Sequence, residues 1–381
     1  MKISNVEIMV LEAPGSYGAP KGSEEAYGIK YLAVVKVTTD AGITGYADIE
    51  TQPHVARAIV EAPSGGAVPG FQGLKHVLIG EDPFEVERLW QKMYMASVYY
   101  GRRGAAIQVI SGIDIALWDI IGKAVRKPLY KLLGGGHRDK VRAYASTLFR
   151  PEPSAMEEAC RRYIEQGFTA VKFGWGVFGE DPGRDVLLVE AARRGLGDKC
   201  DLLVDAGWYV RRTPKEAIAL VRRLEPYRPL FVEELLHPED YDGYAQLVAA
   251  VDTLIACGEQ ESTEWGFRTL IERGKVDVVQ PDISRCGGLT VARKVVHMTE
   301  LYNRLCVSHA WTSDLLTAAS LHLCAFMQRS VLVEFNVTRG PLSRALCRNP
   351  LRLKDGHVEV PQEPGLGVEV DETTLEKFRV Q

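Results

Sequence analysis

The sequence predicts an α/β fold in which a closed parallel barrel follows a smaller α+β domain. Short apolar runs of strand-like composition recur from about residue 140 onward, at roughly 25 to 30 residues per unit, with amphipathic segments between them. Three of these runs end at or close to an acidic residue. Acidic residues at these positions are expected where the carboxyl ends of barrel strands meet at one rim.

The first part of the chain has a different pattern. Residues 1–13 and 31–49 read as an antiparallel β-meander, and residues 84–94 and 111–125 read as helices. We therefore expect an N-terminal α+β domain over residues 1–135. Its segment Gly15 to Gly28, rich in Gly, Ser and Tyr, is longer than a hairpin turn needs and fits either a mobile lid or a disordered surface loop.

The barrel is expected over residues 136–345, and eight runs supply its strands. These are VRAYAS near 141, AVKF near 170, LLVD near 202, LFVE near 230, LIAC near 254, VDVVQ near 276, CVSH near 306 and VLVEF near 331. Capping boxes are expected at Ser154 with Glu157 and at Thr213 with Glu216. The alternative, an open doubly wound sheet, lacks the support of a GxGxxG or GxxxxGK[ST] motif.

The last segment, residues 346–381, contains no full strand-helix unit. It includes GHVEVPQEPGLGVEV at 356–370, and we expect it to return to the N-terminal domain.

Composition excludes several classes of protein. A net charge of −4, from 46 basic and 50 acidic residues that are intermixed, gives no basic face for nucleic acid and no polybasic tail for lipid. No apolar run is expected to span a membrane, and the N-terminus lacks the apolar region of a signal peptide. The seven cysteines are odd in number and form no CxxC pair, which indicates reduced thiols and a cytoplasmic protein.

The three acidic residues are Asp205, Glu233 and Glu259, which stand 28 and 26 positions apart. A single acid after a strand is usually a solvated loop residue or a helix cap, but three in phase converge on one point of a barrel rim. Carboxylate oxygens without Cys or His favour a hard ion over zinc. The sequence therefore predicts a Mg²⁺ site.

Four more polar residues stand at strand ends: Lys172, Asp282, His309 and Glu334. Asp282 and His309 lie on successive strands, so the carboxylate can orient the imidazole and leave its other nitrogen free as a general base. Each residue also has a structural reading, as a turn former, a cap or a member of an ion pair, and Trp208 and Trp311 can be packing residues. Their shared placement at one end of successive strands favours a catalytic site.

This set of groups fits removal of the proton next to a carboxylate. Negative charge then accumulates on the carboxylate oxygens as an enediolate, which Mg²⁺ and Lys172 would neutralise. Metal-dependent amide hydrolysis, a competing barrel chemistry, normally needs an HxH cluster, and the eight histidines include none.

The chain resembles the mandelate racemase branch of the enolase superfamily over nearly its whole length. The residues that carry the resemblance are 111–135, the three acids, QPDISRCGGLT at 280–290, His309 and PGLGVEV at 364–370. The resemblance implies a modified TIM barrel of seven helices and eight strands beneath an α+β capping domain, one essential Mg²⁺, and lids that select the substrate. It also implies that Asp282 orients His309 and that Glu334 acts near the substrate carboxylate.

Two departures from that family bear on the reaction. Racemases of this branch carry Lys-x-Lys at the second strand, whereas this chain reads Lys172-Phe173-Gly174. Many relatives have Asn where this chain has Gly207, which is followed by Trp208. The resemblance therefore implies an acid-sugar dehydratase that uses one histidine on an aldonate or aldarate. We expect Trp208, whose bulk reshapes the pocket, and Trp311 to be substrate-binding residues.

Two alternatives remain open: a sugar-lactone cycloisomerase or epimerase of the same superfamily, and a non-catalytic metal-binding barrel. The region from Glu50 to His54 is expected to contact substrate hydroxyls. A homo-oligomer, either a dimer or an octamer, is expected by resemblance.

Overall fold

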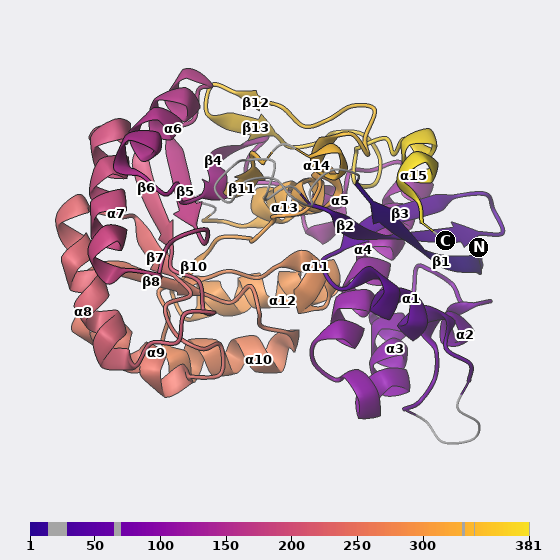
Figure 1. Ribbon diagram of the computed structural model, residues 1–381. Coiled ribbons are helices and arrows are strands. Elements are labelled where there is room, and N and C mark those ends of the chain that lie inside the picture. The colour runs from indigo at the N-terminus through magenta and orange to yellow at the C-terminus, as the bar shows by residue number, and fades with distance from the viewer. Residues whose placement is uncertain (14–28, 65–69, 330–331, 339, 381) are drawn as a thin grey trace.

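The computed structural model describes residues 1–13, 29–64, 70–329, 332–338 and 340–380. Figure 1 shows a barrel with its outer helices on one side and the N-terminal domain on the other, where both chain ends lie. The predicted lid segment, Gly15 to Gly28, falls outside the described residues.

The N-terminal domain packs helices against a three-stranded antiparallel sheet in the order β1-β2-β3, which confirms the predicted meander. Its elements are β1 (Ile3–Glu12), β2 (Tyr31–Thr39), β3 (Thr44–Ile49), α1 (Pro53–Glu61), α2 (Leu74–Leu78), α3 (Val86–Gly101), α4 (Ala105–Val125) and α5 (Leu129–Leu133). Helix α4 lies very close to β3, since a Cβ at Gly45 would stand 2.0 Å from the carbonyl oxygen of Ala116. Glycine at this position is therefore what lets strand and helix approach.

Helix α4 corrects one expectation. Its 21 residues have a mean hydropathy of 1.5, so by length and composition it could cross a membrane, contrary to the expectation that no run could. In the structure 89% of its most apolar window is buried. It packs against β2 and β3 on the sheet and against α11 (Ile283–Cys286) and α12 (Gly288–Leu301) of the barrel, so neighbours on several sides explain its apolar composition.

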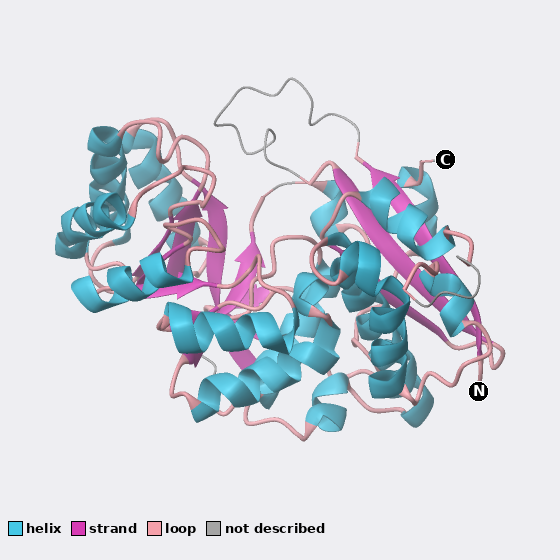
Figure 2. Ribbon diagram, turned by 90° about the horizontal axis from the view of Figure 1, so that it is seen from below, coloured by secondary structure: helices cyan, strands magenta, loops and turns pink. Residues whose placement is uncertain are grey.

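The barrel contains all eight predicted strands. They are β4 (Lys140–Leu148), β5 (Ala170–Gly174), β6 (Asp201–Asp205), β7 (Phe231–Glu233), β8 (Leu254–Cys257), β9 (Val278–Val279), β10 (Leu305–Cys306) and β11 (Val333–Asn336). Parallel pairing runs from β11 through β4 and then in sequence order to β10. Figure 2 shows these strands inside a layer of helices.

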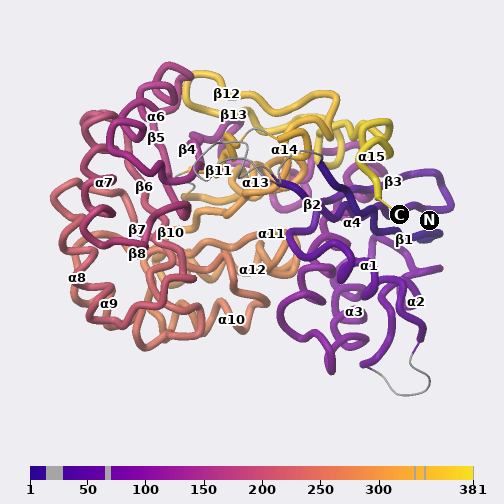
Figure 3. The backbone as a smooth tube through the Cα atoms, viewed as in Figure 1, coloured from indigo at the N-terminus to yellow at the C-terminus, as the bar shows by residue number. Residues whose placement is uncertain are grey.

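Each of the seven connections between successive barrel strands contains helix, as expected for the modified barrel. In order along the chain the helices are α6 (Pro153–Glu165), α7 (Pro182–Leu196), α8 (Pro214–Leu224), α9 (Tyr241–Ala250), α10 (Thr263–Thr269), α11 with α12, and α13 (Asp314–Phe326). The path is easily followed in the tube of Figure 3.

One of the two expected capping boxes is present. Thr213 and Glu216 cap α8 reciprocally, as predicted. The box at Ser154 and Glu157 was wrong: α6 begins at Pro153 after Glu152, whose side chain makes no capping hydrogen bond. Proline is favoured at the first helical position because its φ is already helical, so the helix starts at Pro153, two residues before the start that a Ser154 cap would give.

The C-terminal segment contacts both parts of the molecule. The hairpin of β12 (Leu353–Lys354) and β13 (His357–Glu359) adds to the barrel, where β13 pairs antiparallel with β4. Further along, the N–H of Gly365 donates to the Lys127 carbonyl at 3.0 Å and that of Val380 donates to the Val10 carbonyl at 2.9 Å. Helix α14 (Pro341–Arg344) precedes this hairpin in the chain, and helix α15 (Glu372–Phe378) follows it.

A buried histidine joins these segments and predicts a pH effect on stability. His322 of α13 accepts a hydrogen bond from the Tyr130 N–H at 3.4 Å and contacts the Leu366 carbonyl at 3.1 Å. Burial lowers the pKa of His322 to about 4. In the unfolded chain a histidine has an ordinary pKa near 6.5, so between about pH 4 and pH 6.5 the unfolded chain binds more protons than the folded one. The stability that neutral His322 contributes is therefore fully present above about pH 6.5 and is lost as the pH falls toward 4.

We therefore expect the melting temperature of the native chain to fall toward that of His322→Asn as the pH drops from 7 to 4.5. Through this one group, the free energy of unfolding should fall by at most about 1.4 kcal/mol for each pH unit. A melting-temperature gap that stays constant across this range would contradict the assignment.

Candidate active site

Three carboxylates meet at the carboxyl ends of neighbouring barrel strands. Asp205 and Glu233 are register partners at the ends of β6 and β7, and Glu259 lies two residues beyond β8. One oxygen of each lies within 4.8 Å of the others. All three side chains are buried, so this end of the barrel gathers negative charge away from water.

This donor set fits a divalent cation. Burial and the neighbouring Glu233 raise the pKa of Asp205 well above its usual range, and burial likewise raises the pKa of Glu233. Gln280 donates to Glu233 at 2.5 Å, while its own amide oxygen is buried without a partner among the residues described. Clustered oxygen donors of this kind suit a hard ion, whose charge would offset their mutual repulsion.

Lys172 of β5 lies beside this group. Its Nζ stands 2.5 Å from Glu233 Oε1 and 3.1 Å from Glu334 Oε1. Burial acts to lower the pKa of Lys172, but Glu233 and Glu334 outweigh it and hold the pKa well above its usual value. Lys172 is therefore a buried ammonium group fixed between two carboxylates.

Both carboxylate oxygens of Glu334, on β11, accept hydrogen bonds. Its Oε1 accepts from the Ser146 hydroxyl at 2.6 Å, and its Oε2 accepts from the Ala310 N–H at 2.7 Å. Burial acts to raise the pKa of Glu334, yet Lys172 and His309 bring it down to about 2. Glu334 is thus a fixed carboxylate between the ammonium group and the imidazole.

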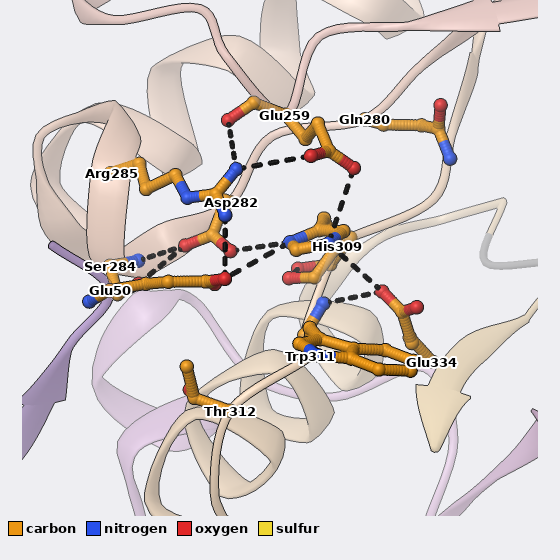
Figure 4. A network of polar contacts seen from close by, with 12 residues as sticks. Glu50, Glu259, Gln280, Asp282, Ser284, Arg285, His309, Trp311, Thr312 and Glu334 are labelled. Carbon is orange, nitrogen blue, oxygen red and sulfur yellow. Dashed lines mark hydrogen bonds and ion pairs between the residues drawn. The ribbon is translucent and has the colours of Figure 1, made fainter. Parts of the chain in front are cut away.

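His309 and Asp282 form a hydrogen-bonded pair, as Figure 4 shows. His309 Nδ1 lies 2.6 Å from Asp282 Oδ2, and the other Asp282 oxygen accepts from the backbone and the hydroxyl of Ser284, both at 2.7 Å. Because Asp282 accepts the Nδ1 proton, Nε2 is the nitrogen available to take another. Nε2 faces Glu259 at 3.2 Å and Glu334 at 3.8 Å.

The charge around His309 determines its protonation. Burial acts to lower the pKa of His309, but Glu259, Glu334 and the hydrogen bond to Asp282 hold it well above 6.5. If the charge of Glu259 were neutralised, the first of the carboxylates that raise the pKa of His309 would no longer act.

The N-terminal domain contributes Glu50, which follows β3. Arg285 reaches Glu50 Oε1 at 2.6 Å with one guanidinium nitrogen and Glu259 Oε1 at 3.2 Å with the other. The Glu50 N–H donates to the Ser284 hydroxyl at 3.3 Å, so this strand also supports the Asp282–His309 pair. Burial raises the pKa of Glu50 to about 7, although Arg285 acts against it.

A cavity of about 500 Å³ opens above these groups. The rings of Trp175 and Tyr209 stack in its wall with centroids 4.6 Å apart, and Trp311 also lines it. A cavity of this size suits a small organic ligand. Trp208 lies elsewhere: it is not among the lining residues, and its ring meets that of His237 edge-on at 6.4 Å.

The structure brings together seven of the predicted residues: Lys172, Asp205, Glu233, Glu259, Asp282, His309 and Glu334. Sequence reasoning missed Trp175, Tyr209, Arg285, Ser146 and Ser284. Trp175 directly follows the end of β5, the same signal that singled out the acids, so the rule of strand-end positions could have found it. Arg285 and Ser284 lie within the stretch 280–290 but follow no spacing rule.

The chain is similar to two protein families, to curated proteins and to solved structures. A family model described as the N-terminal domain of mandelate racemase / muconate lactonizing enzyme matches residues 22–134. A second model, described as enolase C-terminal domain-like, matches residues 155–374. Together they cover most of the chain.

Among curated proteins, the D-galactarolactone cycloisomerase of Agrobacterium fabrum is 33% identical over 363 residues, covering 91% of both chains. The D-galactonate dehydratase of Ralstonia pickettii is 32% identical, covering 90% of this chain and 89% of the relative. The arabinonate dehydratase of Saccharolobus solfataricus is 33% identical, covering 80% and 81%.

Solved structures agree closely with the fold. The 3,6-anhydro-D-galactonate cycloisomerase from Zobellia galactanivorans superposes with a TM-score of 0.88 at 31% identity, covering 100% of both chains. A racemase from Streptomyces coelicolor A3(2) with bound magnesium gives a TM-score of 0.84 at 28% identity, covering 99% of this chain and 100% of that one.

Proposed function

This chain belongs to the mandelate racemase / muconate lactonizing enzyme family of the enolase superfamily, and from that membership we propose that it is an acid-sugar dehydratase. It is a hydro-lyase that converts an aldonate or related sugar acid into a 2-keto-3-deoxy acid. The observation that carries the assignment is a single imidazole, His309, oriented by Asp282 beside three carboxylates.

The opposite side of the site supports one-base chemistry. Lys172 is bound to Glu233 and Glu334, and the second lysine position of a racemase is occupied by Gly174. A racemase needs a base on each face of the reacting carbon, whereas dehydration needs one group that first takes and then returns a proton.

We propose that Asp205, Glu233 and Glu259 hold Mg²⁺. The ion would supply positive charge that neutralises these carboxylates and the charge growing on the substrate carboxylate. The bound magnesium of the Streptomyces coelicolor racemase and the buried oxygen donors here both support this choice.

The chain's own residues account for the proton transfers. With Glu259 neutralised, His309 loses one cause of its raised pKa, and Nε2 can take the proton from the carbon next to the substrate carboxylate. Asp282 stabilises the imidazolium that results. Lys172, which is fixed between Glu233 and Glu334, would supply positive charge near the enediolate. The imidazolium then protonates the departing β-hydroxyl, which leaves as water. The enol that remains tautomerises to the 2-keto acid.

A cycloisomerase of the same superfamily is the second candidate. Two of the similar proteins are cycloisomerases, and Gly207 leaves no side chain two residues after Asp205 that could act as a separate acid for dehydration. A non-catalytic barrel is disfavoured because a scaffold has no need of the Asp282–His309 pair or of the clustered acids.

Product analysis tests the proposal. The Mg²⁺-supplemented protein should be screened against a stereochemically complete set of aldonates and aldarates, with semicarbazide to detect 2-keto acids. Dehydration yields a 2-keto acid from at least one of them. Activity on sugar lactones alone, without 2-keto acid, would favour the cycloisomerase instead.

Removal of the metal should strongly reduce turnover. We expect treatment with EDTA to lower the rate at least about 10²- to 10³-fold, and added Mg²⁺ to restore it, because the charge on the substrate carboxylate would lose its main stabiliser. The melting temperature should also rise on titration with Mg²⁺, since a ligand that binds only the folded state stabilises it. Full activity in the presence of chelator would contradict the proposed site.

We further propose that the protein works as a homo-oligomer in the cytoplasm, without nucleic-acid or membrane partners. The seven cysteines are all free and buried, which fits a reducing compartment. Light scattering coupled to gel filtration distinguishes a dimer from an octamer.

A further inference from the structure

The cavity above the carboxylates has an uneven distribution of charge. Its floor holds Glu259 and His309, above the buried Lys172, where the substrate carboxylate and reacting carbon would lie. Nearer the N-terminal domain it is lined by Glu50, and in the segment after β5 by Glu180. Both of these additional groups are acidic.

Apart from the imidazole of His309, Arg285 is the only basic side chain that lines the cavity among the residues that the structure describes, and it already contacts two carboxylates. Arg285 is bound to Glu50 at 2.6 Å and to Glu259 at 3.2 Å, and its side chain is 14% exposed. Its positive charge is therefore already paired with two protein carboxylates. A second carboxylate on a ligand would have to compete with both of them.

Glu50 also has a carboxylate oxygen that water does not reach. Its Oε2 is buried and has no hydrogen-bond partner among the described residues, and it stands 3.9 Å from His309 Nδ1. A carboxylate oxygen without a partner in a low-dielectric site acts strongly on other charges nearby. Glu180 is weaker, since its side chain is 58% exposed and paired with Arg184 at 2.8 Å.

The rest of the lining is mostly aromatic and aliphatic, and its one amide side chain, Gln260, donates to Glu259 Oε1 at 3.3 Å. The stacked rings of Trp175 and Tyr209, together with Trp311, offer apolar surface and no cation. Such a wall accepts the carbon chain of a polyol, but it offers no positive charge that would compensate the lost hydration of a second carboxylate.

Building on the proposed function, we infer that the substrate carries a single carboxylate, as an aldonate does, and that Glu50 is the specificity-determining residue that rejects an aldarate with a carboxylate at each end. Glu50 does so in two ways: it repels the distal carboxylate, and it occupies the Arg285 guanidinium that would otherwise bind it. Like charges placed against each other across a binding site are a common means of excluding a wrong partner.

The test compares pairs of sugar acids that share one configuration, such as galactonate with galactarate and gluconate with glucarate. The value of kcat/KM is measured for each with the Mg²⁺-loaded protein at pH 8. We expect the native protein to favour the aldonate of its best pair by at least about 10²-fold. Glu50→Gln should shrink this ratio at least about tenfold, because it removes the charge and releases Arg285.

Glu61→Gln, which alters an exposed acid on α1 of the same domain, is the matched control and should leave the ratio unchanged. Glu50→Ala serves as a second variant, and thermal unfolding with and without Mg²⁺ verifies that each variant is folded. Equal turnover of both members of the pair, or a ratio that Glu50→Gln does not change, would overturn the inference while leaving dehydration intact. If no acid sugar is consumed, the proposed dehydration is wrong and this inference falls with it.

Discussion

Replacing His309 with asparagine should lower kcat on the best acid sugar by at least about 10³-fold. General acid–base catalysis by one positioned group typically contributes 10²- to 10⁴-fold, and in this mechanism the same imidazole acts twice. An asparagine side chain can still fit beside Asp282, but its amide cannot act as a base that takes a proton from carbon. The rate is measured as formation of 2-keto acid with the Mg²⁺-loaded variant.

Two comparisons make this result specific. His297→Asn, which changes a largely exposed histidine of α12, should leave kcat unchanged. The rise in melting temperature with Mg²⁺ should persist in His309→Asn, since Asp205, Glu233 and Glu259 remain. Normal turnover by His309→Asn would show that the base is another residue.

Lys172→Met should reduce kcat by about 10²- to 10³-fold, the usual effect of losing one preorganised electrostatic stabiliser. It should also destabilise the fold by about 3 to 5 kcal/mol, because Glu233 and Glu334 would be left buried without the cation that they share. The two effects are separated by measuring kcat well below the melting temperature and the free energy of unfolding by urea titration.

Lys199→Met is the matched control, since Lys199 is exposed and makes no contact with the site. It should change neither quantity. A Lys172→Met variant that is less stable but fully active would mean that the ammonium group has only a structural role.

The barrel could be predicted because its strands are buried on both faces and read as continuous apolar runs. LLVD and LFVE became β6 and β7, and the rule that their ends share a rim correctly placed Asp205 beside Glu233. The carboxylate cluster was accessible to sequence reasoning because each strand fixes where its own last residue points.

Contacts between distant segments could not be predicted in the same way. Glu50 meets Arg285 only because β3 docks on the barrel, and no local pattern encodes how two domains dock. Trp208 and Tyr209 are adjacent in sequence, yet Tyr209 lines the cavity and Trp208 turns toward His237, since the loop after β6 sets their directions. The substrate-binding role of Trp208 stays a prediction, and Trp311 does line the cavity as that role requires.

In the proposed mechanism His309 removes the proton next to the substrate carboxylate, and the β-hydroxyl then leaves. The most direct test is ¹H NMR of the Mg²⁺-loaded protein with its best acid sugar in D₂O. We predict loss of the C2 proton signal, a 2-keto-3-deoxy product carrying solvent deuterium at C3, and neither change with His309→Asn. A product with the same composition as the substrate, or C2 proton loss that continues in His309→Asn, would contradict this account.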